Sequence, residues 1–177
     1  MAGSGPSKKA EPRLARREEL ALLPIIEQRA GERLQGHPAD AVFAASPTPI
    51  AAFEQGMLQQ SLWVTESDAG DVVGYLLAGV LEDDFHVQQM DVLPEHGGKG
   101  HGRALLRYAL RQAVERGHRR AVLTTLKDAP WNAGFYASEG FRVWPREAWS
   151  AGMRRVMAEE ASAGFPMALR VAMLREL

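Results

Sequence analysis

Four of the six residues from position 97 to 102 are glycine, in the stretch "HGGKGHGRALL" that runs from His96 to Leu106. Glycine lacks a Cβ atom, so such a segment can bend sharply and bring its backbone close to a ligand. The Ala and Leu residues that follow predict a helix, whose first N–H groups and positive dipole end would face the bend. The pattern therefore favours a binding site for an anion, most often a phosphate, over an exposed flexible loop.

Composition narrows the class of protein. The 177 residues suit one domain, which we expect to span residues 12–177 after a disordered tail at residues 1–11. The formal net charge of -1 gives no support to nucleic-acid binding driven by charge. The chain has no Cys, and its five His show no ligand spacing, so we expect neither disulfides nor a metal.

Targeting and membrane signals are absent from the sequence. The N-terminal stretch "MAGSGPSKKAEP" lacks the apolar segment of a secretory signal. The longest apolar runs, such as "VVGYLLAGVL", are too short to span a bilayer. We therefore expect a cytoplasmic protein with neither a membrane nor a nucleic acid as partner.

Hydrophobic periodicity predicts a mixed order of helices and strands. The predicted helices cover residues 18–34 (opened or kinked by Pro24), 50–60, 102–116, 128–140 and 147–161. The predicted strands cover residues 12–16, 61–67, 71–81, 85–93, 121–126, 141–144 and 166–174. This order indicates an α/β protein built around one mixed sheet, with the glycine loop at the C-terminal end of a strand, where ligands bind in such sheets.

Two common phosphate-binding patterns do not fit the loop. In the P-loop pattern, Gly97 and Gly102 have the right separation, but Arg103 and Ala104 stand where Lys and Ser/Thr are required. In the dinucleotide-binding pattern, the third glycine position holds Arg103 or Leu105. Both nucleotide hydrolysis by a P-loop and Rossmann-type cofactor binding are therefore disfavoured.

A third pattern fits. The run "GGKGHGRALL" resembles the pyrophosphate loop of the GNAT superfamily of N-acetyltransferases, whose motif reads Gln/Arg-x-x-Gly-x-Gly/Ala. Gly97 stands at the first position, which departs from the motif and costs one side-chain contact at the edge of the loop. The preceding "MDVLPEH" and "VVGYLLAG" and the following "APWNAGFYASEGF" resemble further parts of the family pattern, so the likeness covers roughly residues 12 to 145.

The resemblance implies a fold and a cosubstrate. The fold would be a GNAT-like α+β arrangement, with a mixed, mostly antiparallel central sheet and helices on both faces. The cosubstrate would be acetyl-CoA, with its pyrophosphate held by backbone N–H groups of the glycine loop. The resemblance assigns this cradle to Gly97, Gly98, Lys99, Gly100, His101, Gly102 and Arg103. Lys99 and Arg103 either add charge there or are ordinary solvated cations.

The resemblance also implies how the rest of the cofactor is held. The backbone of Met90 and Val92 would pair with the pantetheine arm as a strand edge pairs with a peptide. Asn132 either hydrogen-bonds the arm or stabilises the start of its own helix. A backbone N–H near Met90 would stabilise the negative charge that develops on the reacting carbonyl oxygen. Tyr136 matches the family's general acid, which protonates the departing thiolate.

The general base is less determined by the pattern. His86 lies on the predicted strand and, by its period of two, on the face of Gln88 and Met90. Its imidazole titrates near neutrality, which suits a base. Other candidates are Asp83, Asp84, Asp91 or an ordered water. Trp131, Phe135, Trp144 and Trp149 are expected in the core or in an acceptor pocket.

These residues predict an N-acetyltransferase that moves an acetyl group to a primary amine by direct attack in a ternary complex. The acceptor would be a small molecule or a protein amine. Two alternatives stay open: a non-catalytic acyl-CoA-binding module and transfer of a longer acyl chain. A homodimer through a sheet edge or the last helix is also left open.

Overall fold

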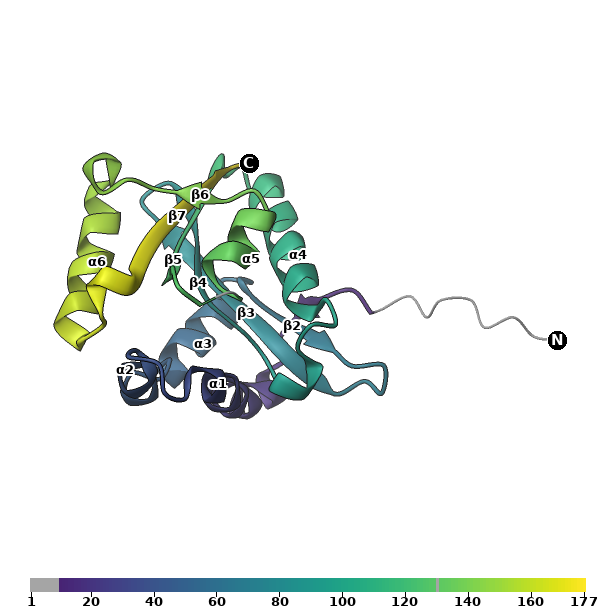
Figure 1. Cartoon of the computed structure of the whole chain (residues 1–177). Helices are drawn as coiled ribbons and strands as arrows, with labels where there is room; N and C mark the ends of the chain where they lie inside the picture. The colour runs from purple at the N-terminus through teal and green to yellow at the C-terminus, as the bar shows by residue number, and fades with distance from the viewer. Residues whose placement is uncertain (1–9, 130) are drawn as a thin grey trace.

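The computed structural model describes residues 10–129 and 131–177. Most of the tail predicted at residues 1–11, and Pro130, which was expected in the first turn of a helix, lie outside the described residues. Figure 1 shows a central sheet with helices packed on either side of it. None of the helices in the described ranges has the length and apolar character needed to cross a bilayer.

The elements alternate as the sequence pattern predicts. The helices are α1 (Leu23–Gly31), α2 (Asp40–Ala45), α3 (Ile50–Leu58), α4 (His101–Glu115), α5 (Ala133–Ser138) and α6 (Ala151–Ala163). The strands are β1 (Arg13–Leu14), β2 (Leu62–Glu66), β3 (Val72–Leu81), β4 (Asp84–Val92), β5 (Arg120–Leu126), β6 (Arg142–Val143) and β7 (Arg170–Glu176). Short 3-10 helices are η1 (Arg17–Leu22), η2 (Glu32–Leu34), η3 (Pro94–His96), η4 (Arg146–Ala148) and η5 (Met167–Leu169).

The strands form one sheet in the order β1-β2-β3-β4-β5-β7-β6. Within the described residues, β4 and β5 are the only parallel neighbours, and every other pair is antiparallel. A parallel pair needs a crossover connection, which here is the glycine loop followed by α4. The mixed, mostly antiparallel sheet that the sequence predicted is therefore confirmed.

Helices cover both faces of the sheet, as predicted. On one face α4 inserts Leu105, Leu106 and Ala109 into a core that also holds Phe85 and Val87 of β4. On the other face η1, α1 and α3 pack against β2 and β3. There α6 covers the far half of the sheet, packing on β5 and β7. The two faces follow from the alternation of side chains along each strand.

Strand β4 contains a bulge that shapes the site. Leu77 and Ala78 are consecutive on β3 but face Gln89 and Val87 on β4, so Gln88 is the extra residue. A bulge bends its strand and increases the local twist. β4 and β5 pair only at Phe85–Ala121 and His86–Val122, before the bulge. Beyond that point the two strands no longer pair, and a cleft opens between them.

The N-terminal helix differs from the prediction. Instead of one helix over residues 18–34, the chain forms η1, α1 and η2 in succession. Pro24 lies in the first turn of α1, where its missing N–H is not needed. The sequence did not predict α2, because its six residues between breakers are too few to display a helical period.

Two later boundaries also differ. The predicted helix at 147–161 begins at Ala151, because Ser150 caps it by accepting a hydrogen bond from the Met153 N–H at 3.1 Å. The predicted strand at 166–174 begins only at Arg170, since η5 occupies the preceding residues. The C-terminus of α4 agrees with the prediction, because Gly117 follows it with a φ of 85°.

Candidate active site

A cavity of about 1430 Å³ occupies the cleft between β4 and β5. Its walls come from six segments: α1 with η2, α2, residues 87–92 of β4, the glycine loop with the start of α4, residues 123–125 of β5, and α5. Glu160, Phe165 and Arg170 close one end. A concave space of this size suits a ligand larger than a simple metabolite.

The glycine loop presents unpaired backbone donors. The Gly97 N–H donates to the Pro94 carbonyl at 3.0 Å, and the Ala104 N–H donates to the Gly100 carbonyl at 3.0 Å. Between these two positions, several amides have no acceptor in the described part of the chain, those of Gly98, Lys99, Gly100, Gly102 and Arg103. Such a row of donors at the start of a helix is a cradle for an anion.

Two glycines of this loop are required by the backbone. Gly98 has a φ of 70° and Gly100 a φ of 87°, in the left-handed region that side chains disfavour. Gly102 is not required in this way, because its φ is not positive. A Cβ atom there would lie 3.8 Å from Met90 Cε and 3.9 Å from Val92 Cγ2, an ordinary packing distance, so the start of α4 rests directly on β4.

The charged residues of the loop are placed differently from one another. Lys99 is exposed and is not among the described residues that line the cavity. Arg103 lines the cavity but pairs with the buried Glu139 at 3.1 Å and lies over the ring of Phe135. His101 is buried, and its Nδ1 lies 3.2 Å from the Thr65 hydroxyl.

Tyr136 reaches the cavity from α5. Its side chain is 9% exposed and packs against Phe135 and Phe141, yet its hydroxyl makes no hydrogen bond to a described residue. Burial raises the pKa of Tyr136, and the negative charge of Asp91 raises it further. The phenol therefore stays protonated and is available to donate to a ligand.

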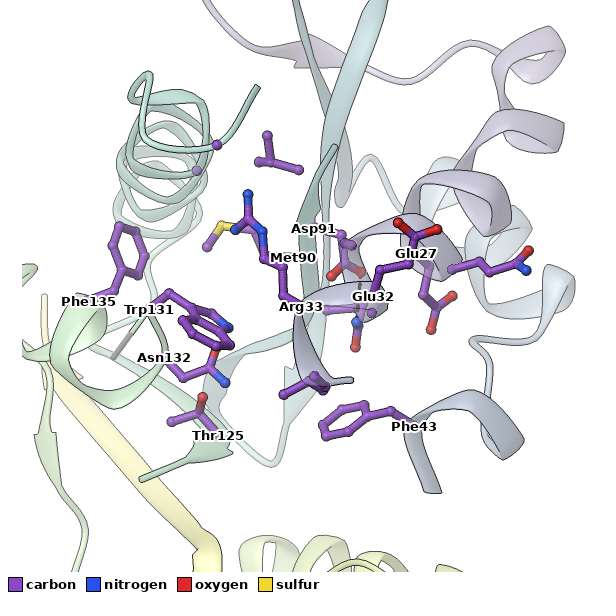
Figure 2. Close-up of a pocket in the computed structure, with 18 of the residues that line it drawn as sticks. Glu27, Glu32, Arg33, Phe43, Met90, Asp91, Thr125, Trp131, Asn132 and Phe135 are labelled. Carbon is purple, nitrogen blue, oxygen red and sulfur yellow. Dashed lines mark hydrogen bonds between the residues drawn. The ribbon is translucent and has the colours of Figure 1, made fainter. Parts of the chain in front are cut away.

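Asn132 also lines the cavity. It is the residue before α5, but its side chain makes no capping hydrogen bond to that helix. The helix-stabilising alternative left open by the sequence is therefore not observed. Figure 2 shows Asn132 with Trp131 and Phe135 on one side of the cavity, opposite the carboxylates of Glu27, Glu32 and Asp91.

Asp91 lies on β4 beside Met90 and faces the cavity. Its Oδ2 accepts hydrogen bonds from the Tyr75 hydroxyl at 2.8 Å and from Gln89 Nε2 at 2.8 Å. Burial raises the pKa of Asp91 to about 6, against the effect of these hydrogen bonds, and the charge of Glu27 raises it further. A carboxyl group with a pKa near neutrality is suited to proton transfer.

Glu27 supplies a second carboxylate to the same wall. It lies on α1 and accepts hydrogen bonds from the N–H and the hydroxyl of Thr48, both at 3.0 Å. Burial raises its pKa. Glu27 and Asp91 therefore face one cavity as two partly buried carboxyl groups, and no cation forms an ion pair with either within the described residues.

The placement of His86 differs from the expectation. The bulge at Gln88 shifts the alternation by one residue, so Met90 and Val92 face the α4 side together with Phe85 and Val87. The prediction that His86 shares a face with Met90 is therefore wrong. His86 is not among the described residues lining the cavity, and burial lowers its pKa to about 4.

The other acidic candidates for the general base lie away from the cavity. Asp84 is buried and pairs with Arg120 at 2.6 Å, and neither Asp83 nor Asp84 is among the described residues of the cavity wall. Sequence reasoning missed Glu27 and Arg33, which line the cavity from α1 and η2. Their positions gave no signal, because polar residues on an amphipathic helix normally face solvent.

The sequence and the fold were compared with those of known proteins. A family model described as Acetyltransferase (GNAT) domain matches residues 59–143. That range contains β2 to β6, the bulge, the glycine loop, α4 and α5.

Solved structures share the fold. A GCN5-related N-acetyltransferase from Rhodopseudomonas palustris is 20% identical, with a TM-score of 0.70 over 99% of this chain and 100% of that one. The PaiA N-acetyltransferase from Thermoplasma acidophilum, in complex with coenzyme A, is 14% identical, with a TM-score of 0.66 over 94% and 98%. A GNAT-family acetyltransferase from Staphylococcus aureus is 15% identical, with a TM-score of 0.68 over 94% and 98%.

The solved structures support the arrangement of the sheet and helices, while the family model covers the segments that form the loop and both strands of the cleft. Residues 59–143 match the GNAT acetyltransferase domain, and solved GNAT acetyltransferases share the fold of the chain.

Proposed function

We propose that the protein is an acetyl-CoA-dependent N-acetyltransferase. One observation carries the proposal: a single cavity joins the unpaired amides of the glycine loop, the open edge of β4 and the hydroxyl of Tyr136. Each feature suits one part of acetyl-CoA. The loop amides suit its pyrophosphate, the edge of β4 suits its amide-bearing arm, and the hydroxyl suits its thioester.

The residues present fit the cosubstrate. Backbone N–H groups from Gly98 to Arg103 would hold the pyrophosphate. Main-chain groups of Met90 and Val92, on the edge that β5 leaves unpaired, would pair with the arm, and Asn132 would add a side-chain hydrogen bond. Bound acetyl-CoA supplies an acetyl thioester to the centre of the cleft.

Tyr136 is proposed as the general acid. Its hydroxyl has no partner among the described residues and a raised pKa, so it holds its proton until a stronger base appears beside it. A departing thiolate is such a base once the carbon–sulfur bond breaks. A backbone N–H near Met90 is proposed to stabilise charge on the carbonyl oxygen.

Asp91 is proposed as the general base in place of His86. It lies in the cavity, its pKa is near neutrality, and both hydrogen bonds it accepts within the protein end on Oδ2. Its Oδ1 would take one proton from the bound ammonium group, so that the neutral amine attacks the acetyl carbon. The nitrogen would lose its second proton as the carbon–sulfur bond breaks, and this proton would replace the one that Tyr136 gives to the thiolate. His86, with its pKa of about 4 and its place outside the cavity wall, is a weaker candidate.

The acceptor is proposed to be a cationic amine. The wall opposite Trp131 and Asn132 carries the carboxylates of Glu27, Glu32 and Asp91 (Figure 2). Carboxylates are hydrogen-bond acceptors and carry negative charge, so they would attract an ammonium group into the cleft. A cytoplasmic location, the absence of nucleic-acid partners and a homodimer stay predictions.

The test is release of free thiol from acetyl-CoA with a panel of amines. The panel contains diamines, amino sugars, amino acids and peptides with a free N-terminus or lysine. Turnover with a cationic amine is the expected result. Tight binding of CoA without turnover of any amine would favour the non-catalytic acyl-CoA-binding module, and absence of CoA binding would overturn the enzymatic proposal itself.

A further inference from the structure

The backbone conformation at position 97 does not require a glycine. Gly97 has a φ of -64° and a ψ of 151°, a conformation open to any residue. The atoms that a side chain there would meet belong mainly to Arg33. A Cβ atom on Gly97 would overlap Nη2 of Arg33 and would lie 3.1 Å from its Cζ. The guanidinium of Arg33 therefore fills the volume that a side chain at position 97 would take.

Arg33 reaches this place from a distant part of the chain. It belongs to η2, directly after α1, and Figure 2 shows its side chain extended across the cavity toward Met90. Its nearest polar contact is a long one, 3.4 Å from Nη2 to the Pro94 carbonyl at the start of the loop. No carboxylate lies within ion-pair distance of it among the described residues, although its charge acts on the pKa of Asp91 and lowers it.

The other cations near the loop are engaged or directed elsewhere. Arg103 is held by Glu139 at 3.1 Å. Arg29, one turn before Arg33, pairs with Glu95 at 2.8 Å and does not line the described part of the cavity. Lys99 is exposed and outside the cavity wall. Arg33 thus brings a guanidinium without an ion-pair partner among the described residues to the loop whose own amides lack acceptors.

We propose that Arg33 is the cationic ligand of the diphosphate of coenzyme A, contributed by η2 in place of a side chain at position 97. The inference rests on the proposed function. A guanidinium can donate two parallel N–H bonds to phosphate oxygens, which backbone amides on the opposite side of the anion complement. The absence of a side chain at position 97 then leaves the space in which the Arg33 guanidinium lies beside the loop.

The first test measures binding of CoA to the wild type and to Arg33→Ala by calorimetry. Loss of a charged hydrogen-bonding ligand should weaken binding about tenfold or more. Dephospho-CoA, which keeps the diphosphate but lacks the 3′-phosphate, should show the same loss. Pantetheine, which has no phosphate, should bind both proteins equally. Arg29→Ala is the matched control, because it removes an equal charge one turn away and should leave CoA affinity unchanged.

A second test moves the arginine to the other side of the loop. In Arg33→Ala/Gly97→Arg the new side chain can occupy the volume that Arg33 has left, so the double variant should regain most of the lost affinity. Melting curves of all variants in the absence of ligand check that they fold alike. Gly97→Arg alone should not bind more tightly than the wild type, because two guanidinium groups would compete for one space.

The outcomes separate this inference from the function it rests on. Wild-type binding of CoA with unchanged affinity in Arg33→Ala, or with an equal loss in Arg29→Ala, would overturn the role of Arg33 and leave the enzyme intact. A loss confined to CoA and absent with dephospho-CoA would place Arg33 at the 3′-phosphate and refute the diphosphate contact. A wild type that binds no CoA would overturn both proposals.

Discussion

Tyr136 is the side chain on which the proposed chemistry can be tested most directly. Replacing it with Phe keeps the ring that packs between Phe135 and Phe141 and removes only the hydroxyl. We expect kcat to fall by about 10²–10³-fold, as is typical for loss of a general acid, with CoA affinity nearly unchanged. Steady-state kinetics and calorimetry on Tyr136→Phe measure both. Full activity in this variant would show that the thiolate receives its proton from another donor.

The raised pKa of Asp91 leads to a prediction about how the stability of the fold depends on pH. Its pKa of about 6 in the folded protein exceeds the usual value of 3.8, so the folded state binds the proton more tightly than the unfolded state. This contribution stabilises the fold fully below about pH 4 and is lost as the pH rises through about 6.

In Asp91→Asn the titrating group is absent. Between pH 4.5 and 8, the free energy of unfolding of the wild type should therefore fall by about 2 kcal/mol relative to that of the variant. Denaturant titrations of both proteins at the two pH values measure the difference. A difference that does not change with pH would mean that the carboxyl group titrates normally. The same variant should also lose about 10²-fold or more in kcat if Asp91 is the base.

At the scale of elements, β4 shows where sequence reasoning succeeds and where it fails. Alternation located the strand, and its end at Pro94 located the loop, because both depend on neighbouring residues. The bulge at Gln88 depends on how β4 pairs with β3, and no residue in "HVQQMDV" predicts it. One inserted residue reverses every later face assignment, and for this reason the period of two put His86 on the face of Met90.

The glycine loop and α4 give a prediction at the same scale. Gly100 precedes α4 with a φ of 87°, whereas Gly102 lies within the first turn of the helix with open packing distance to β4. We expect Gly100→Ala to lower the free energy of unfolding by about 1–2 kcal/mol, the cost of a Cβ in the left-handed region. Gly102→Ala should be neutral or stabilising by up to about 1 kcal/mol, because alanine favours helix. Equal destabilisation of both variants in denaturant titrations would contradict this assignment of roles.

For the whole molecule, the site is assembled from parts that are far apart in sequence. Motif reading found the loop and Tyr136, because their order and spacing lie within one contiguous region. Glu27 and Arg33 enter the cavity only because α1 and η2 pack over the open end of β4. That packing depends on the divergence of β4 from β5, a property of the assembled sheet. The positions of Glu27 and Arg33 in the cavity were for this reason beyond what the sequence pattern could predict.

The divergence of β4 from β5 also leads to a prediction about hydrogen exchange across the cleft. Because β4 and β5 pair only at two positions, the main-chain groups of residues 88–92 on the cleft side have no strand partner, and the loop amides have no acceptor among the described residues. A ligand that bridges both should slow their hydrogen exchange together. With saturating CoA we expect exchange in residues 88–92 and 98–103 to slow on the order of tenfold at short times.

Pantetheine separates the two contributions to this protection. It carries the amide arm without the diphosphate, so it should protect residues 88–92 and leave 98–103 as fast as in the free protein. The buried strand β2 serves as the internal reference, since it lies away from the cleft and exchanges only through larger openings. Protection by CoA that spares the glycine loop, or protection of the loop by pantetheine, would show that the unpaired amides of α4 and its loop do not hold the diphosphate. The diphosphate would then have to be held by side chains.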